Sequence, residues 1–187
     1  MNFNKHLELV GAHAFLSASK YHWVNYDDDK ISSAYARHLA AQQGTILHDF
    51  ASQCIKLKQK LPKSKKSLNA FVNDAIGFRM SSEQILYYSP NAFGTADAIS
   101  FRDKLLRIHD LKTGVIPVST KQLYVYAALF CLEYDIKPTK IDIELRIYKS
   151  NEVLIENPDK TEILRIMDKI VSFDKQIEKI KAEELED

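Results

Sequence analysis

The sequence predicts an α/β protein with a central mixed β-sheet flanked by helices. Three observations support this class: helical periodicity before residue 80, consecutive extended segments in the middle, and then a helix, a strand and a charged helix. The chain has 187 residues, 45% of them hydrophobic, which is enough for one sizeable core. We expect one domain over residues 1–187, with a core at about 17–156 and a terminal helix at about 159–184.

The N-terminal part predicts a long helical region. From Ser32 to about Leu61 the chain has no proline and a single glycine, and its apolar residues recur at helical spacing. This pattern indicates one long helix, or two in succession, stopped by Pro62. A further helix is expected from Leu68 to about Phe78.

The middle of the chain predicts a β-meander. Its extended segments are Gln84 to Ser89, Ala92 to Arg102 and Leu105 to Lys112, and Asp103-Lys104 marks a tight turn between the last two. Ser119 and Thr120 can then cap a helix that runs to about Tyr134.

The last third predicts a strand, a short strand and a helix. Apolar and polar residues alternate from Ile141 to Tyr148, as in a half-buried strand, and a short strand follows at Glu152 to Ile155. After Pro158, isoleucines recur at spacings of three and four in a charged helix. The apolar stripe spans fewer than three heptads, so docking on its own domain and homo-oligomerisation through this helix both stay open.

Composition restricts the classes of function. The formal net charge is +1, so any nucleic-acid contact has to come from local patches. The two cysteines, Cys54 and Cys131, cannot supply a four-cysteine zinc or iron–sulfur site. A reducing cytoplasm fits this usage. We expect no membrane association and no export, because the sequence has no long apolar run and no apolar N-terminus.

Two opposite charges end the third extended segment. Residues two apart in a strand share a face, so Asp110 and Lys112 continue the row of Leu106 and Ile108, whereas His109 faces the other side. A carboxylate that can hold a cation thus lies beside an ammonium that can orient water, a pair suited to phosphodiester hydrolysis. A purely structural ion pair is the alternative. The following glycine and a second acid in the preceding segment favour a cation site.

That second acid is Asp97, three residues after Gly94. If the two strands pair through the Asp103-Lys104 turn, Asp97 lies at a level similar to that of Asp110. Hard carboxylate oxygens suit Mg²⁺ or Mn²⁺, which can polarise a phosphate and lower the pKa of bound water. Asp97 alone would be interpreted as a turn-capping acid, but together with Asp110 and Lys112 it predicts a metal site.

Four short motifs occur in a specific order: Gly44-Thr45-Ile46-Leu47-His48, Gly94 to Asp97, Asp110 to Lys112, and Gln122 to Tyr126. Each is weak alone. Together they resemble the PD-(D/E)XK nuclease superfamily, and within it the RecB-like branch that includes nucleases of CRISPR adaptation. The resemblance covers roughly residues 17 to 134 and implies a restriction-endonuclease-like core.

The resemblance implies a role for each motif residue. His48, Asp97 and Asp110 look like metal ligands, with the main-chain carbonyl of Leu111 as a further ligand. Lys112 looks like the lysine that orients or activates the attacking water, so the implied catalytic residues are Asp97, Asp110 and Lys112. A histidine ligand also suggests tolerance for Mn²⁺.

The fourth motif and a lysine-rich segment are the candidates for DNA contact. Gln122 and Tyr126 match the family pair thought to contact DNA and brace the site, and they share one helix face. Lys56, Lys58 and Lys60 begin a run of six lysines without an acid. A solvated helix end is the slightly better interpretation of that run, and a phosphate-binding patch is the alternative.

Two departures from the branch are informative. Asp110 stands where glutamate is commoner, which shortens the ligand and keeps its charge. The flanking cysteines of iron–sulfur members are missing, so we expect no such cluster, and no Walker phosphate loop is present. A standalone, phage-type nuclease is therefore expected, with a helicase or recombination protein as a possible separate partner.

The resulting expectation is a Mg²⁺- or Mn²⁺-dependent deoxyribonuclease for DNA recombination, repair or end processing. An exonuclease is favoured over a site-specific endonuclease, because nothing in the sequence suggests an added sequence-reading domain. RNA cleavage is a further possibility. The competing class is a module on the same fold that binds DNA or a protein without cutting.

Overall fold

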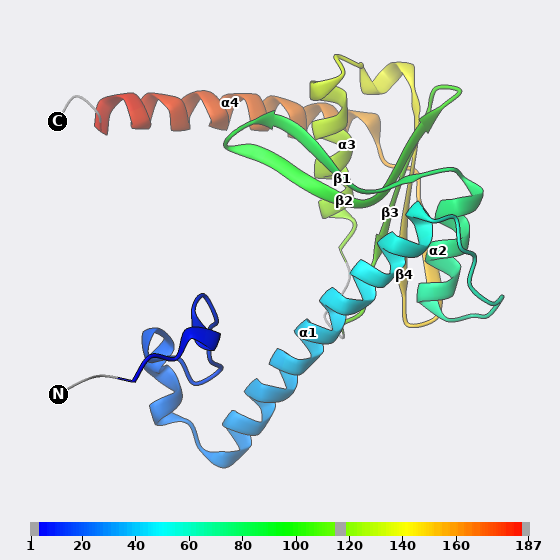
Figure 1. Ribbon diagram of the computed structural model, residues 1–187. Helices are drawn as coiled ribbons and strands as arrows, with labels where there is room; N and C mark the ends of the chain where they lie inside the picture. Colours follow the sequence, from blue (N-terminus) through cyan, green and yellow to red (C-terminus); the bar gives the residue numbers. More distant parts are fainter. Residues whose placement is uncertain (1–3, 115–118, 185–187) are drawn as a thin grey trace. The chain divides into compact units, whose positions relative to one another are not determined.

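The computed structural model describes residues 4–114 and 119–184 (Figure 1). By internal contacts the chain divides into two compact units, Met1–Thr45 and Ile46–Asp187. All side chains predicted for the metal site belong to the second unit.

The first unit is helical. Two 3₁₀ helices, Leu7–Leu9 and Ala18–Asn25, precede α1 (Asp28–Lys56), which continues into the second unit. The Asp27 carboxylate accepts a hydrogen bond from the Lys30 backbone N–H at 2.8 Å, which satisfies one of the free donors at the start of a helix. The ring of Phe15 packs edge-on against that of Tyr35, with 5.1 Å between their centroids.

The second unit is built on a mixed five-stranded sheet in the order β1-β2-β3-β4-β5 (Figure 1). Neighbouring strands are antiparallel except β3 and β4, which are parallel. This architecture confirms the predicted fold class. The strands are β1 (Ser81–Ser89), β2 (Ala92–Arg102), β3 (Leu105–Leu111), β4 (Asp142–Lys149) and β5 (Glu152–Glu156).

Helices cover both faces of this sheet. The parallel pair requires a crossover, and α3 (Lys121–Glu133) lies in it. Together with α4 (Lys160–Glu184), α3 buries one face of the sheet, where Leu106, Ile108 and Leu145 form the core. On the other face, α2 (Ser67–Gly77) and the end of α1 enclose a second core around Phe71, Leu111 and Tyr148.

Two-residue turns fix the register of two hairpins. Asp103 and Lys104 have φ angles of 51° and 61°, and Ser150 and Asn151 have φ angles of 51° and 65°. Two consecutive positive φ angles are typical of the turn type whose twist matches that of paired strands. The turn predicted at Asp103-Lys104 is thereby confirmed.

The first long helix differs from its predicted range at both ends. It begins at Asp28, because Asp27 caps it, and it ends at Lys56. Beyond its end, Lys58 has a φ of 55° and the Gln59 N–H donates to the Cys54 carbonyl at 2.9 Å. This left-handed termination ends the helix before Pro62 is reached.

The C-terminal helix is half covered. Ile163 at its start is fully buried against the core, whereas Phe173 and Ile180 are 56% and 46% exposed. Homo-oligomerisation through this helix stays a prediction. Within residues 4–114 and 119–184, no helix combines the length and the apolarity needed to cross a membrane.

Candidate metal centre

The site lies where β2 and β3 separate. Their last register pair in this direction is Ala98 with His109. Beyond it, the Asp97 carboxylate accepts a hydrogen bond from the Leu111 backbone N–H at 2.8 Å. A side chain thus replaces a strand-to-strand bond, which fixes Asp97 beside the end of β3, close to Asp110.

His48 and Glu83 complete an acidic group around Asp97. Nδ1 of His48, on α1, lies 3.4 Å from the Asp97 carboxylate. One ligand atom each from His48, Glu83 and Asp97 all lie within 4.8 Å of one another. Among the described residues, no other group of three or more possible metal ligands lies this close together. Asp110 is not part of this group.

Glu83 is a site residue that the sequence analysis missed. It lies in β1 between the pairs Ser82–Ala98 and Gln84–Ala96, which places it opposite Asp97. The predicted strand began at Gln84, three residues after the start of β1, and so left Glu83 out. Glu83 has a φ of 50°, an uncommon backbone state for a non-glycine residue that occurs at functional sites. Extending the predicted pairing of these two strands by one residue towards the N-terminus would have placed Glu83 opposite Asp97.

The pKa shifts in this group indicate crowded negative charge. Burial, and then the charge of Asp97, raises the pKa of Asp110. The same two causes, in the same order, raise the pKa of Glu83. The hydrogen bond to Asp97 raises the pKa of His48 against the effect of burial. The raised pKa values of Asp110 and Glu83 mean that their charged forms are disfavoured, so a bound cation would stabilise these two carboxylates.

One carboxylate oxygen of Asp110 accepts a hydrogen bond, and the other has no hydrogen-bond partner among the described residues. It is 3% exposed, and its Oδ1 accepts a hydrogen bond from Nζ of Lys112 at 3.0 Å. Its Oδ2 is buried and makes no hydrogen bond within the described part of the chain. A buried, unpaired carboxylate oxygen is costly, and a metal ion is one group that could satisfy it.

Lys112 begins a chain of polar contacts that leads to α3. Its Nζ also donates to Oε1 of Gln122 at 2.8 Å, and Nε2 of Gln122 donates to the hydroxyl of Tyr126 at 2.9 Å. Gln122 and Tyr126 lie one helical turn apart, as predicted from their spacing. The structure therefore brings Asp110, Lys112, Gln122 and Tyr126 together.

The backbone around Leu111 is held from both sides. The Lys112 N–H donates to the Tyr148 carbonyl at 2.9 Å, which continues the β3–β4 pairing. In an extended strand, the N–H and C=O of one residue point to the same side. Because the Leu111 N–H points to Asp97, the Leu111 carbonyl points to that side as well, as expected for a main-chain ligand.

Behind the site, His109 lies on the opposite face of β3, as predicted. It is fully buried, and its Nδ1 lies 3.2 Å from the hydroxyl of Tyr148, which donates to Asp74 at 2.7 Å. Burial, and then the charges of Arg146 and Arg107, lowers the pKa of His109 to about 3. His109 is thus a neutral core residue that anchors the strand carrying Asp110.

The three lysines predicted to bind DNA are exposed and do not form one group at the site. Lys56 is close enough to Glu83 for its charge to counteract the rise of the Glu83 pKa. Lys58 lines a different hollow, together with Arg79 and Arg102. Lys60 lies in the loop after α1. A phosphate-binding role for the three lysines remains a prediction.

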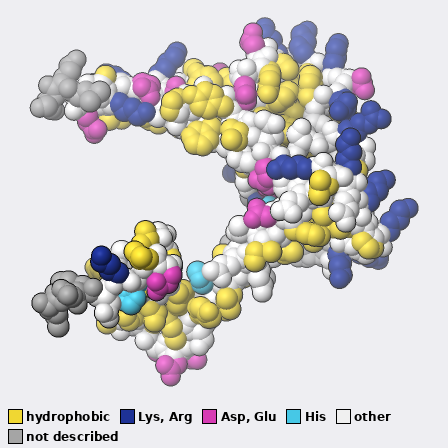
Figure 2. Space-filling model, viewed as in Figure 1, with side chains coloured by type: hydrophobic (Ala, Val, Ile, Leu, Met, Phe, Trp, Pro, Cys, Tyr) yellow, Lys and Arg dark blue, Asp and Glu magenta, His cyan; other side chains and the backbone are white. Residues whose placement is uncertain are grey.

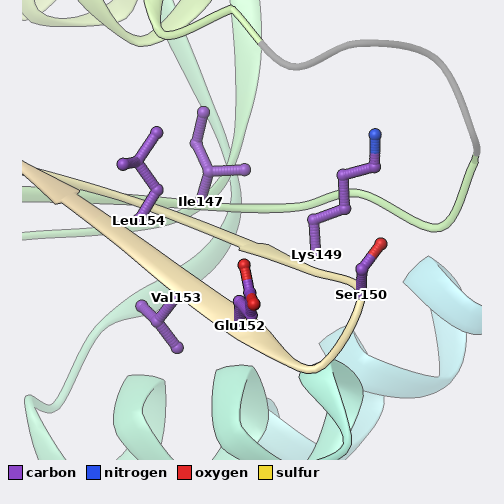
Figure 3. A pocket seen from close by; sticks show the side chains of 6 residues that line it. All are labelled: Ile147, Lys149, Ser150, Glu152, Val153 and Leu154. Carbon is purple, nitrogen blue, oxygen red and sulfur yellow. The ribbon is translucent and has the colours of Figure 1, made fainter.

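A further lysine lies at the same end of the neighbouring strand. Tyr148 in β4 is the register partner of Leu111 in β3. Lys112 directly follows Leu111, and Lys149 directly follows Tyr148. Figure 3 shows its side chain extending beside the β4–β5 turn, and it lines a hollow with Ile147 and Leu154. Lys112 and Lys149 therefore follow paired residues at the same end of two neighbouring parallel strands.

The comparisons with known proteins add one match. A family model described as "Protein of unknown function (DUF2800)" matches residues 76–149. No curated protein and no solved structure matches the chain. The matched segment contains Glu83, Asp97, Asp110, Lys112 and Gln122, so the chain resembles this family over most of the candidate site.

Proposed function

We propose that this protein is a metal-dependent deoxyribonuclease of the RecB-like branch of the PD-(D/E)XK superfamily. The observation that supports this most is the arrangement around Asp110. One oxygen of its carboxylate accepts from Lys112, and the other is buried and unpaired within the described residues. An acidic group with a histidine lies beside it.

The donor set fits Mg²⁺ or Mn²⁺. Asp97, Asp110 and the Leu111 carbonyl supply hard oxygen ligands, His48 supplies one imidazole nitrogen, and Glu83 adds a further carboxylate. A divalent cation bound there would polarise a phosphate and lower the pKa of a coordinated water. The raised pKa values of Asp110 and Glu83 give the same expectation, since a cation would offset the repulsion between the acids.

Lys112 is placed to orient the reacting groups. An ammonium has three N–H donors, and two of those on Lys112 go to Asp110 and Gln122. The third can donate to the attacking water or to a phosphate oxygen. In the hydrolysis, the water oxygen bonds to phosphorus and the bond from phosphorus to the leaving sugar oxygen breaks. A water proton passes to solvent, and the leaving oxygen takes up a proton.

The experiment is a cleavage assay on defined nucleic acids. Purified protein is incubated with linear and circular DNA, single- and double-stranded, and with RNA, in Mg²⁺, Mn²⁺ or a chelator. We expect metal-dependent cleavage of DNA that is lost in Asp110→Asn, with Asp135→Asn, at an exposed position after α3, as the matched surface control. Degradation of linear but not circular DNA would support an exonuclease acting in recombination, repair or end processing.

The same assay tests the competing function. Intact DNA in every metal condition, combined with measurable DNA binding, would favour a module that binds without cutting. Cleavage of RNA alone would move the proposal to a ribonuclease. Activity in Asp110→Asn equal to wild type would show that the reaction, if present, uses another site.

A further inference from the structure

The hairpin of β1 and β2 exposes an apolar face. Ile85, Tyr87 and Phe93 are 56%, 46% and 62% exposed. Figure 2 shows hydrophobic side chains gathered over this hairpin and the neighbouring part of α4. Large apolar side chains that gather on a protein surface mark interaction sites.

The strand alternation explains why this face is free. On the inner side of the hairpin, Leu86 and Ala96 are buried in the core with α3, and Gly94 lies against the ring of Tyr126. The intervening residues must point outwards, and β1 alternates accordingly from Ser81 to Tyr87.

The outer face leads directly to the acidic group. Tyr87 is the register partner of Phe93, and Ile85 is the partner of Thr95. Two residues further along each strand, the same row reaches Glu83 and Asp97. At about 3.3 Å per residue, the aromatic pair lies about 13 Å from the acidic pair. This distance is within the reach of a short single strand.

The segment from Gln84 to Ala96 has no charged side chain. Residues 84–96 contain no Asp, Glu, Lys, Arg or His, although 27% of the chain is charged. A duplex presents its phosphates and keeps its bases stacked inside, so a segment without lysine or arginine offers it little. A single strand presents the faces of its bases, and aromatic side chains stack on these whatever the sequence.

We propose that the outer face of the β1–β2 hairpin, with Tyr87 and Phe93 as its aromatic pair, is a stacking platform for unpaired bases of a DNA strand whose backbone enters the metal site. This inference rests on the proposed function and adds its substrate class, a single strand or a frayed end. A second copy of the chain is the alternative occupant, but it would not account for the continuity of the platform with the acidic pair.

The test measures single-strand affinity without cleavage. A fluorescently labelled single-stranded oligonucleotide and the duplex of the same sequence are titrated in chelator, with anisotropy as the readout. We expect tighter binding of the single strand by the wild type. Tyr87→Ala and Phe93→Ala should each weaken single-strand binding roughly 5- to 100-fold, with a smaller effect on the duplex.

Two controls separate stacking from a general loss of structure. Phe93→Trp keeps a stacking ring and should retain the affinity. Phe101→Ala removes an exposed aromatic at the opposite end of β2 and should leave the affinity unchanged. Circular dichroism and thermal unfolding check each variant, and folding should be retained because the substituted side chains are exposed.

Each outcome decides between the two proposals. Unchanged single-strand affinity in both alanine variants, or no single-strand binding by the wild type, overturns the platform even if the wild type cleaves DNA. Loss of a dimer in light scattering, without loss of affinity, assigns the face to a second copy and also overturns it. Weakened binding in the variants of a protein that never cleaves supports the platform and removes the nuclease proposal.

Discussion

A β-carbon added at Gly94 would lie 2.9 Å from Cε1 of Tyr126, closer than carbon atoms pack. The two residues come from separate motifs, and the structure makes them contact partners. Tyr126 in turn accepts a hydrogen bond from Gln122, which holds Lys112. The glycine is therefore required by the ring that braces the lysine.

Gly94→Ala should reduce DNA cleavage without unfolding the protein. The added methyl group displaces the Tyr126 ring, and the displacement passes through Gln122 to Lys112. A misplacement of about 1 Å in a reacting group can cost up to ~100-fold in rate, so we expect a fall of roughly 10- to 100-fold. Gly77→Ala is the matched control, because a β-carbon there meets no atom within 4 Å. Cleavage by Gly94→Ala at the wild-type rate would contradict the proposed bracing.

Lys112→Ala should separate metal binding from catalysis. Removing the ammonium leaves the ligands in place, so Mn²⁺ binding measured by calorimetry should persist. The cleavage rate should fall about 100- to 1000-fold, the typical cost of losing one donor aimed at the reacting group. Lys140→Ala, at an exposed position before β4, should cleave normally. Loss of Mn²⁺ binding in Lys112→Ala would mean that the lysine mainly supports the fold of the site.

Glu83→Gln tests the acid that emerged from the structure alone. In the metal-free protein, burial and repulsion by Asp97 raise the pKa of Glu83. Removing its charge should leave thermal stability in chelator equal or higher. The rise of the melting temperature on adding Mn²⁺ should become smaller, because a ligand is lost. An equal rise in Glu83→Gln and the wild type would exclude Glu83 from the metal site.

His109 should make the metal-free protein sensitive to acid. Its folded pKa is lowered to about 3, so the unfolded chain binds the proton more readily. The stabilisation is complete above the unfolded pKa of about 6.5 and is lost progressively as the pH falls towards 3. Between pH 6.5 and 4.5 this amounts to a loss on the order of 2–3 kcal/mol in the free energy of unfolding.

Urea unfolding in chelator from pH 7.5 to 4.5 measures this loss. His109→Gln, which does not titrate, should show a smaller loss, and His13→Gln, at an exposed position, should behave as the wild type. The same pH dependence in all three proteins would show that His109 is accessible to protons in the folded state.

The sequence predicted much of the sheet and one half of the site. Alternation in β3 placed Asp110 and Lys112 on one face and His109 on the other, because period-two patterns report the faces of a strand directly. The turn at Asp103-Lys104 set the β2–β3 register. Residue spacing also placed Gln122 and Tyr126 on one helix face.

The other half depends on contacts that no local pattern encodes. His48 meets Asp97 from a helix far away in the sequence, and only the resemblance to a known family suggested it. Glu83 was missed because Ser81, Ser82 and Glu83 are all polar, so the start of β1 shows no alternation of apolar and polar residues. The three lysines were proposed from the run of like charges alone, and their DNA-binding role stays a prediction.

The most direct measurement is an anomalous difference map from crystals of this protein soaked in Mn²⁺. We expect a peak within coordination distance of the carboxylates of Asp97 and Asp110 and the imidazole of His48. A saturating soak that leaves these side chains without a peak, or places the ion elsewhere, would contradict the metal centre and the hydrolytic function built on it.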